Sequence, residues 1–397
     1  MIDSKKGAIS AIGEIGTYCG PAFVPFMEES MKALTSASNH WHPSIKYAVA
    51  ESLPSLVIAS VAANHSGKVP WVKGDISGSS PLSSHTNDVT LAVLSLLVPM
   101  MKYEDEDVVG KACEGIQSII ELCGPHALAM VVNDCLGNTL LLLKKEAPCQ
   151  GTIESNGIDD EVDDDHMSFM SSVCDLVGTF AKVMGSFMVP YLASFLQPLV
   201  TNFMKSSCPI DDRSMAIGCL GELAQELGKG ITDYWTSVFL PAIETGLADE
   251  GIHVKRNAAF CAGVCCEHLG DSINMFYPKL LHALHPLFLI DDENSDWSAA
   301  KDNAAAAVAR MIIACPNSVP LIHVMGPFLK ALPLKSDTSE NEVVYNCLMG
   351  LISMNRPELQ GYGPEIQRIV TEVLNDENND VNDDLRSKLR LITGSLT

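Results

Sequence analysis

The residues of this sequence best suited to hold a ligand are carboxylates, amides and one indole toward its C-terminal end. A lysine-rich extended peptide needs carboxylates for its ammonium groups, amides for its backbone and an aromatic wall for its aliphatic stems. Stacked helical repeats would bring together residues of all three kinds: Asp296, Trp297, Asp302, Asn303, Glu340, Asn341 and Glu342. Asn257 and Asn303 occupy equivalent positions in their repeats, so we predict that these two amides clamp one extended peptide strand.

Each of these residues also has an ordinary structural interpretation. We expect Asp296 and Trp297 just before a helix, Asp302 and Asn303 in its first turns, and 340–342 at the start of the next. Acids in a first turn stabilise the helix dipole, and asparagine there often caps the helix. Trp297 equally fits a packed turn residue. The cluster is therefore better supported than any one member.

Metal binding and catalysis are not predicted. Cys261, Cys265, Cys266 and His268 lie close in sequence, but their helical spacing favours a packed apolar stripe over a zinc site. The sequence lacks a Gly-rich phosphate loop, a His-Glu-x-x-His helix and a Gly-x-Ser-x-Gly elbow. We therefore expect no enzyme activity and no cofactor.

The composition limits the partners and the compartment. Forty-nine acids against 26 bases leave a formal net charge of −23, which repels nucleic acid and anionic membranes and suits a basic protein partner. The apolar run 89–101 is shorter than the roughly 20 residues of a membrane span. The 13 cysteines, without a typical signal peptide, indicate buried thiols in a reducing compartment. The abrupt helical pattern at the start suggests a piece of a longer protein.

Helix stop signals recur through the chain and predict its architecture. Gly20, Gly124, Gly185, Gly228 and Gly270 each follow a long apolar stretch, as does Pro316. From Gly185 the steps are 43, 42 and 46 residues, as expected for repeated pairs of antiparallel helices, such as 234–247 with 253–269. We predict an all-α fold, an α-α superhelix of HEAT type, with about eight pairs over 1–397. Small residues such as Ala304–Ala307 should let neighbouring second helices approach closely.

Two longer steps predict loop insertions near 64–87 and 147–166. The second contains 159–165, with six acids in seven positions, which we expect to be disordered when unbound. Glu104–Asp107, Glu114 and Asp175 could extend an acidic inner stripe, although ordinary helix-start acids or solvated helix faces are the favoured interpretation. The small rotation from repeat to repeat creates a concave surface lined by the second helices, where we expect binding.

The ordered motifs of the second half resemble those of a known family. Val254-Lys255-Arg256-Asn257-Ala258 and Glu267-His268 resemble the C-terminal repeats of importin-β-type nuclear transport receptors. The motifs that follow in order resemble the importin-four branch: 277–281, 286–288, Lys301-Asp302-Asn303, Ala309-Arg310-Met311 and 331–335. The likeness is clearest over 210–360.

This resemblance implies a nuclear import receptor that carries histones or ribosomal proteins and shuttles between cytoplasm and nucleus. It implies that Asn303, with Glu340 or Glu342, holds a lysine of a histone H3 or H4 tail. It also implies that Ran-GTP binds an N-terminal arch that this chain lacks. The alternative is a HEAT-repeat scaffold of a multiprotein complex, which would bind a folded partner through apolar patches with weak salt dependence.

Overall fold

The computed structural model describes residues 2–76, 80–151, 164–290, 294–376 and 381–395. Over these ranges the chain forms α-helices, short 3-10 helices and turns, with no β-strand. The prediction of an all-α fold is confirmed. The chain divides into two compact units, Met1–Lys205 and Ser206–Thr397, and each is described by itself. The single array of about eight pairs over 1–397 stays a prediction.

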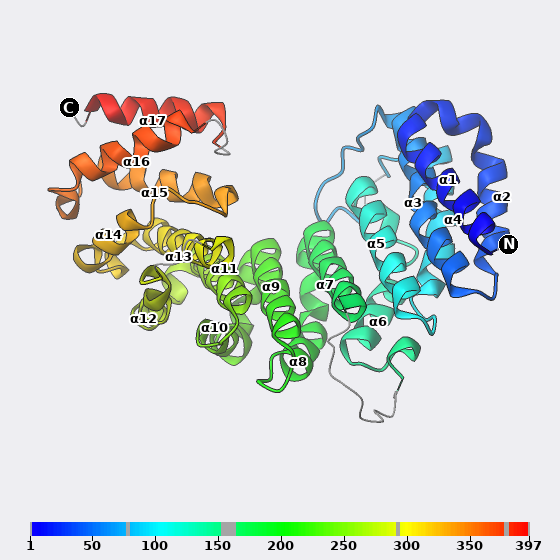
Figure 1. The fold of residues 1–397 in the computed structure, drawn as a ribbon, viewed down its shortest axis with the longest axis horizontal. Coiled ribbons are helices and arrows are strands. Elements are labelled where there is room, and N and C mark those ends of the chain that lie inside the picture. Colours follow the sequence, from blue (N-terminus) through cyan, green and yellow to red (C-terminus); the bar gives the residue numbers. More distant parts are fainter. Residues whose placement is uncertain (1, 77–79, 152–163, 291–293, 377–380, 396–397) are drawn as a thin grey trace. The chain divides into compact units, whose positions relative to one another are not determined.

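The first unit consists of two layers of helices (Figure 1). The second helices of successive pairs, α3, α5 and α7, stack side by side in chain order after α1. The first helices α2, α4 and α6 each pack against the second helix that follows. The bounds are α1 Ile2–Cys19, α2 Met27–Ser38, α3 Pro43–His65, α4 Ser84–Met100, α5 Glu106–Cys123, α6 Val132–Leu143, α7 Asp164–Met184 and α8 Leu192–Phe203.

The second unit repeats this arrangement. Its second helices α9, α11, α13, α15 and α17 stack in chain order, and α10 and α12 cover α11 and α13. The bounds are α9 Ile210–Leu227, α10 Leu240–Leu247, α11 Ile252–Leu269, α12 Tyr277–Phe288, α13 Ser295–Ala314, α14 Leu321–Lys330, α15 Asn341–Ser353, α16 Gly363–Asn375 and α17 Asp383–Ser395.

Helix α5 shows how the sequence produces one of these elements. Asp105 caps its start by accepting a 3.1 Å hydrogen bond from the Val108 N–H, which satisfies a donor that has no partner inside the helix. Its apolar residues recur at three and four spacing and are buried between neighbouring helices. The helix ends where Gly124 adopts a φ of +76°, a conformation that costs glycine little. The predicted stop signal is therefore confirmed here.

Small residues allow the second helices to approach closely, as predicted. Ala304 to Ala307 on α13 are all fully buried. A Cβ atom added to Gly263 of α11 would lie 2.7 Å from the Cα of Ala307, so only glycine fits at this contact. Any larger residue at position 263 would push the two helices apart.

Two predicted helix starts were wrong. The helix expected over 234–247 begins as a 3-10 helix, Gly228–Tyr234, and passes through a π-helical turn, Trp235–Phe239, before α10. Pro241 has no N–H for a regular hydrogen bond at that point. Asp296 and Trp297 lie in the first turn of α13 and not before it, because Asn294 is the N-cap and accepts from the Asp296 N–H at 2.8 Å.

The connections at the expected insertions are long. Between α3 and α4 the chain runs through 66–83, of which 77–79 lie outside the described residues. Before α7 the described part contains the short 3-10 helix Pro148–Gln150. Most of the acidic run 159–165 lies outside the described residues, so its expected disorder stays a prediction.

No apolar run long enough for a membrane span was predicted from the sequence. In the structure, two helical stretches are long and apolar enough to cross a membrane, by length and composition alone. The first, Pro43–His65, has 72% of its most apolar window buried inside the structure, as in a core helix. The second, Phe169–Phe203, contains part of α7, a 3-10 segment and α8, and half of its window is buried. Length and composition are weak evidence for a membrane span.

Candidate functional site

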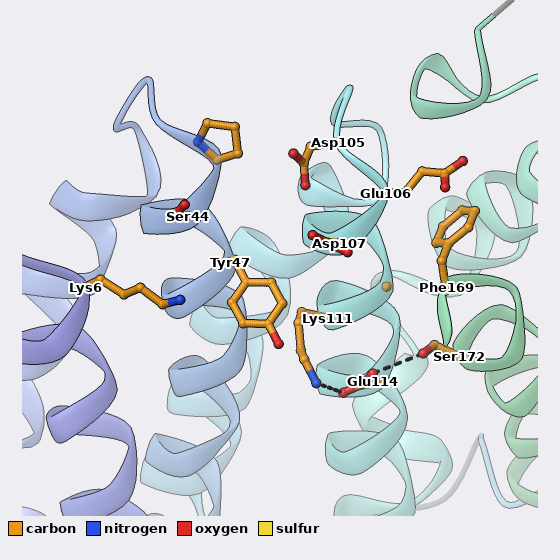
Figure 2. A pocket seen from close by; sticks show the side chains of 12 residues that line it. Lys6, Ser44, Tyr47, Asp105, Glu106, Asp107, Lys111, Glu114, Phe169 and Ser172 are labelled. Atoms are coloured by element: carbon orange, nitrogen blue, oxygen red, sulfur yellow. Dashed lines mark hydrogen bonds and ion pairs between the residues drawn. The ribbon is translucent and has the colours of Figure 1, made fainter. Parts of the chain in front are cut away.

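The first unit contains a groove of about 360 Å³ between the second helices (Figure 2). We call it the inner groove and define it by its charged and aromatic lining. Helix α1 contributes Lys6, α3 contributes Tyr47, and α7 contributes Phe169 with Ser172. The remaining charged residues come from α5 and its cap: Asp105, Glu106, Asp107, Lys111 and Glu114.

The position of each acid follows from the start of α5. Asp105 is the N-cap, and Glu106 and Asp107 lie in the first turn, where the helix dipole favours negative charge. Glu114 lies two turns further on, on the same side as Gly110. At Gly110 a Cβ atom would lie 3.6 Å from the Cα of Phe169, in ordinary contact with α7. Helix-start chemistry thus places acids in the lining of the groove.

The inner groove contains two cationic side chains of this chain. Lys6 and Lys111 each place their ammonium 5.6 Å from the centre of the Tyr47 ring, and Lys111 also contacts Glu114 at 2.5 Å. Figure 2 shows Lys111 reaching toward Glu114, whose other oxygen accepts a 3.1 Å hydrogen bond from Ser172. Burial alone would lower the pKa of Lys111, but Glu114 raises it above its ordinary value. The groove therefore holds the ammonium of its own Lys111 between an aromatic ring and the carboxylate of Glu114.

The negative charge continues along the same helices. Asp175 lies at the surface of α7, and partial desolvation of its carboxyl group, followed by the charges of Glu114 and Glu121, raises its pKa. Lys182 partly balances this charge by contacting Glu121 at 3.0 Å. Asp105, Glu106 and Asp107 are helix-start acids, as the favoured interpretation had it, and the acidic inner stripe stays a prediction.

In the second unit, Asp302 and Asn303 are buried and bonded within the chain. One Asp302 oxygen accepts hydrogen bonds from the N–H groups of Lys335, Ser336 and Asp337 at 2.7–3.0 Å. Burial nevertheless raises the pKa of Asp302. Asn303 donates to Ala299 O at 2.9 Å and to Asp337 at 2.8 Å. Asp302 and Asn303 were predicted in the first turns of their helix, but they lie two turns into α13. From there both side chains reach the turn that precedes α15.

The residues around the start of α15 are divided between the interior and the surface. Glu340 is buried and pairs with Arg310 at 2.6 Å, and Arg310 also contacts Glu267 at 2.9 Å. Asn341 is 1% exposed. Glu342 is exposed. The structure thus brings Glu340 to an arginine of its own chain.

Trp297 lies beside positive charge. It lines a small cavity with Asp302 and three lysines, Lys301, Lys330 and Lys335. Asp296 is exposed and lies 3.8 Å from His253. The predicted aromatic wall thus belongs to a lysine-lined cavity.

Asn257 and Asn303 do not reach in the same direction. Asn257 donates backward to Ser214 of α9, to its carbonyl at 2.9 Å and its hydroxyl at 3.1 Å. Asn303 donates forward, to Asp337 before α15. Each amide group thus connects two neighbouring repeats. The equivalent positions of the two residues in their repeats did not predict these contacts.

Sequence reasoning missed Tyr47 and Phe169, the aromatic walls of the inner groove. Tyr47 lies in the stretch Ile45-Lys46-Tyr47-Ala48, to which the sequence analysis assigned no binding role. One signal could have identified Tyr47 as a site residue. It lies near the start of a second helix, as do the acids at the start of α5. Phe169 follows the acidic run and carried no separate signal.

Comparison with known proteins gives relatives over nearly the whole chain. Human importin-4 is 26% identical over 402 residues, which cover 99% of this chain and 35% of importin-4. Mouse importin-4 is 28% identical, with 99% and 35% covered. A probable importin subunit beta-4 of Schizosaccharomyces pombe is 25% identical, with 97% and 36% covered. The chain thus spans about a third of the length of these relatives. No family model matches it.

Solved structures confirm the fold. The karyopherin Kap121p bound to the SUMO protease Ulp1p has a TM-score of 0.76 at 17% identity, covering 99% of this chain and 35% of Kap121p. Kap121p bound to RanGTP has a TM-score of 0.73 at 16% identity, with the same coverage. The chain therefore has the HEAT-repeat solenoid fold of these proteins.

Proposed function

We propose that this chain, a homologue of the importin-4 receptors in the importin-β family of nuclear transport receptors, binds basic protein cargo on the inner faces of its stacked helices. Transport receptors of this family are not enzymes, and we propose no catalytic role. The observation that carries the proposal is the inner groove, where Tyr47 and Glu114 contact the ammonium of Lys111 and the acids at the start of α5 line the same groove. The net charge of −23 supports the same cargo class.

The cargo that fits best is an extended lysine-rich segment, such as a histone H3 or H4 tail. An extended chain presents alternate side chains to one face, so successive lysines reach separate carboxylates. The inner groove offers acids on α5 and an aromatic ring on α3 and on α7. Ribosomal proteins with similar basic segments form a second cargo class.

The second unit contributes through its accessible residues. Glu342 and Asp296 are exposed, whereas Asp302, Asn303, Glu340 and Asn341 are buried. We propose that the buried set maintains the spacing of α11, α13 and α15, and that Glu342 contacts cargo. Asn257 and Trp297 are assigned to the same supporting role because their contacts lie within the chain or beside lysines.

The wider biology is proposed from the relatives. We propose that the full-length receptor shuttles between cytoplasm and nucleus. We also propose that it binds Ran-GTP through a part outside these 397 residues.

A peptide titration tests the proposed function. The chain is titrated with H3 and H4 tail peptides, unmodified and lysine-acetylated, at two salt concentrations. Acetylation removes the charge that the carboxylates bind, so affinity should fall with each acetylated lysine and with rising salt. Equal affinity for both forms contradicts the proposal. Salt-independent capture of a folded protein would instead favour the scaffold alternative.

A further inference from the structure

We propose that the segment 66–76, which we call the strap, holds the C-terminal ends of α5 and α7 at a fixed distance from α3 and thereby sets the width of the inner groove. The strap begins directly after α3 ends at His65 (Figure 1). The strap contacts α5 of the neighbouring repeat and also α7 of the repeat after it. This reach makes it a candidate positioning segment.

Two hydrogen bonds connect the strap to successive second helices. The Trp71 indole N–H donates to the carbonyl of Glu121 in the last turn of α5, at 3.0 Å. The Gly74 N–H donates to the carbonyl of Val183 in the last turn of α7, at 2.8 Å. Val69 is buried and anchors the strap between His65 and these contacts. One short segment thus binds the ends of two helices and continues directly from a third.

The glycines that end α5 and α7 also make room for the strap. A Cβ atom on Gly124 would lie 2.3 Å from Cγ of Trp71, which no side chain tolerates. A Cβ atom on Gly185 would lie 3.1 Å from Cγ of Lys73. In the second unit, a Cβ atom on the corresponding Gly270 would meet nothing within 4 Å. The strap therefore packs closely against the glycines that end α5 and α7.

The strap and the inner groove lie at opposite ends of the same helices. The groove residues of α3, α5 and α7 belong to their N-terminal halves, whereas the strap contacts the last turns of α5 and α7. Helix α5 has 18 residues and is about 27 Å long. Because a helix of this length moves as a rod, releasing its C-terminal end changes the helix spacing at the groove. The effect on binding rests on the proposed function, whereas the restraint on the helix ends does not.

Hydrogen exchange on the whole chain tests the strap with three variants. Trp71→Ala removes both the indole hydrogen bond and the ring packed on Gly124. Exchange should rise about tenfold in the last turns of α5 and of α7, the change expected when an anchoring hydrogen bond is lost. Trp71→Phe keeps a ring and should give a smaller rise. Val72→Ala changes an exposed strap side chain and should give none.

The response of α7 decides the proposal, because the Trp71 hydrogen bond is made to α5. A rise confined to the end of α5 would overturn the coupling. Should Trp71→Ala fail to fold, Trp71→Phe carries the same comparison. Affinity for a lysine-rich peptide, measured on the same variants, should fall with the rise in exchange. Raised exchange in both helices with unchanged affinity supports the strap and counts against the inner groove as the cargo site.

Discussion

Asn303 donates a 2.8 Å hydrogen bond to Asp337, which lies in the turn that leads into the next repeat. Arg256 of the preceding second helix contacts the same carboxylate oxygen at 3.2 Å. Asp337 therefore connects α11 and α13 to the turn before α15. Burial would raise the pKa of Asp337, but hydrogen bonds from Ser339 and Asn303 and the charge of Arg256 lower it below its ordinary value. We expect the inter-repeat spacing in the second unit to depend on this carboxylate.

Replacing Asp337 should destabilise the second unit. Asp337→Ala removes one of the two acceptors of the buried Asn303 amide, leaving the Ala299 carbonyl, and also removes a partner of Arg256. We expect the free energy of unfolding to fall by about 2–3 kcal/mol, as for a lost hydrogen bond to a charged group. Urea unfolding measures it, with Ser336→Ala, an exposed neighbour, as control. Equal stability of the two variants would show that the turn is held by other contacts.

Glu340 and Glu342 should behave differently although they are two residues apart. Glu340→Gln weakens the pair with Arg310, whose side chain is 13% exposed, and should cost about 2 kcal/mol of stability. Glu342→Gln changes an exposed acid and should stay within about 0.5 kcal/mol. Thermal unfolding of both variants checks this. A stable Glu340→Gln protein would mean that Glu267 alone satisfies Arg310.

Acid should weaken the second unit through the buried pair of Arg213 and Asp249. Their two hydrogen bonds measure 2.8 and 2.9 Å. Burial opposes ionisation of Asp249, but the bonds from Arg213 and the Gly251 N–H lower its pKa below the ordinary 3.8. The stabilisation is therefore complete above the unfolded pKa and is lost as pH falls through the lower folded pKa.

The comparison with Asp249→Asn isolates this contribution. The variant should be less stable than the wild type at neutral pH, by about 2 kcal/mol. The difference should shrink as pH falls through and below the ordinary Asp pKa. A difference in unfolding free energy that does not change with pH would contradict the assignment.

Thiol reactivity should follow burial. Cys19 is exposed, whereas Cys123, Cys135 and Cys347 are buried, and burial raises their pKa to about 11, 12 and 12. At pH 8 these buried thiols therefore stay protonated and unreactive. Brief alkylation of the folded chain, read by mass spectrometry, should label Cys19 first and the buried three only in denaturant. Labelling of all four at one rate would contradict the packing.

The helical architecture was predictable because its signals are local. Gly124 ends α5 through a backbone conformation that the residue itself favours, and Ala304–Ala307 pack closely because they lack bulk. Such signals need no knowledge of distant residues. The regular spacing of the glycines that end these helices then predicted the pairs of helices.

The candidate site was less predictable because buried and exposed polar residues carry the same local signal. Asp302 and Glu342 are both acids in the N-terminal half of a second helix, yet one accepts from three backbone N–H groups and the other faces solvent. The inner groove joins residues of four helices, and the contact of Trp71 with Gly124 spans more than one repeat. These residues come together only in the three-dimensional fold.

The most direct measurement compares two double variants in the affinity for a lysine-rich H3 tail peptide. Asp107→Asn with Glu114→Gln removes two charges from the inner groove, whereas Glu28→Gln with Glu29→Gln removes two from the exposed face of α2. Both change the net charge equally, so non-specific attraction is matched. The groove variant should bind about tenfold more weakly than the α2 variant, since each contact contributes up to about 1 kcal/mol. Equal affinities would contradict the inner groove as the cargo site.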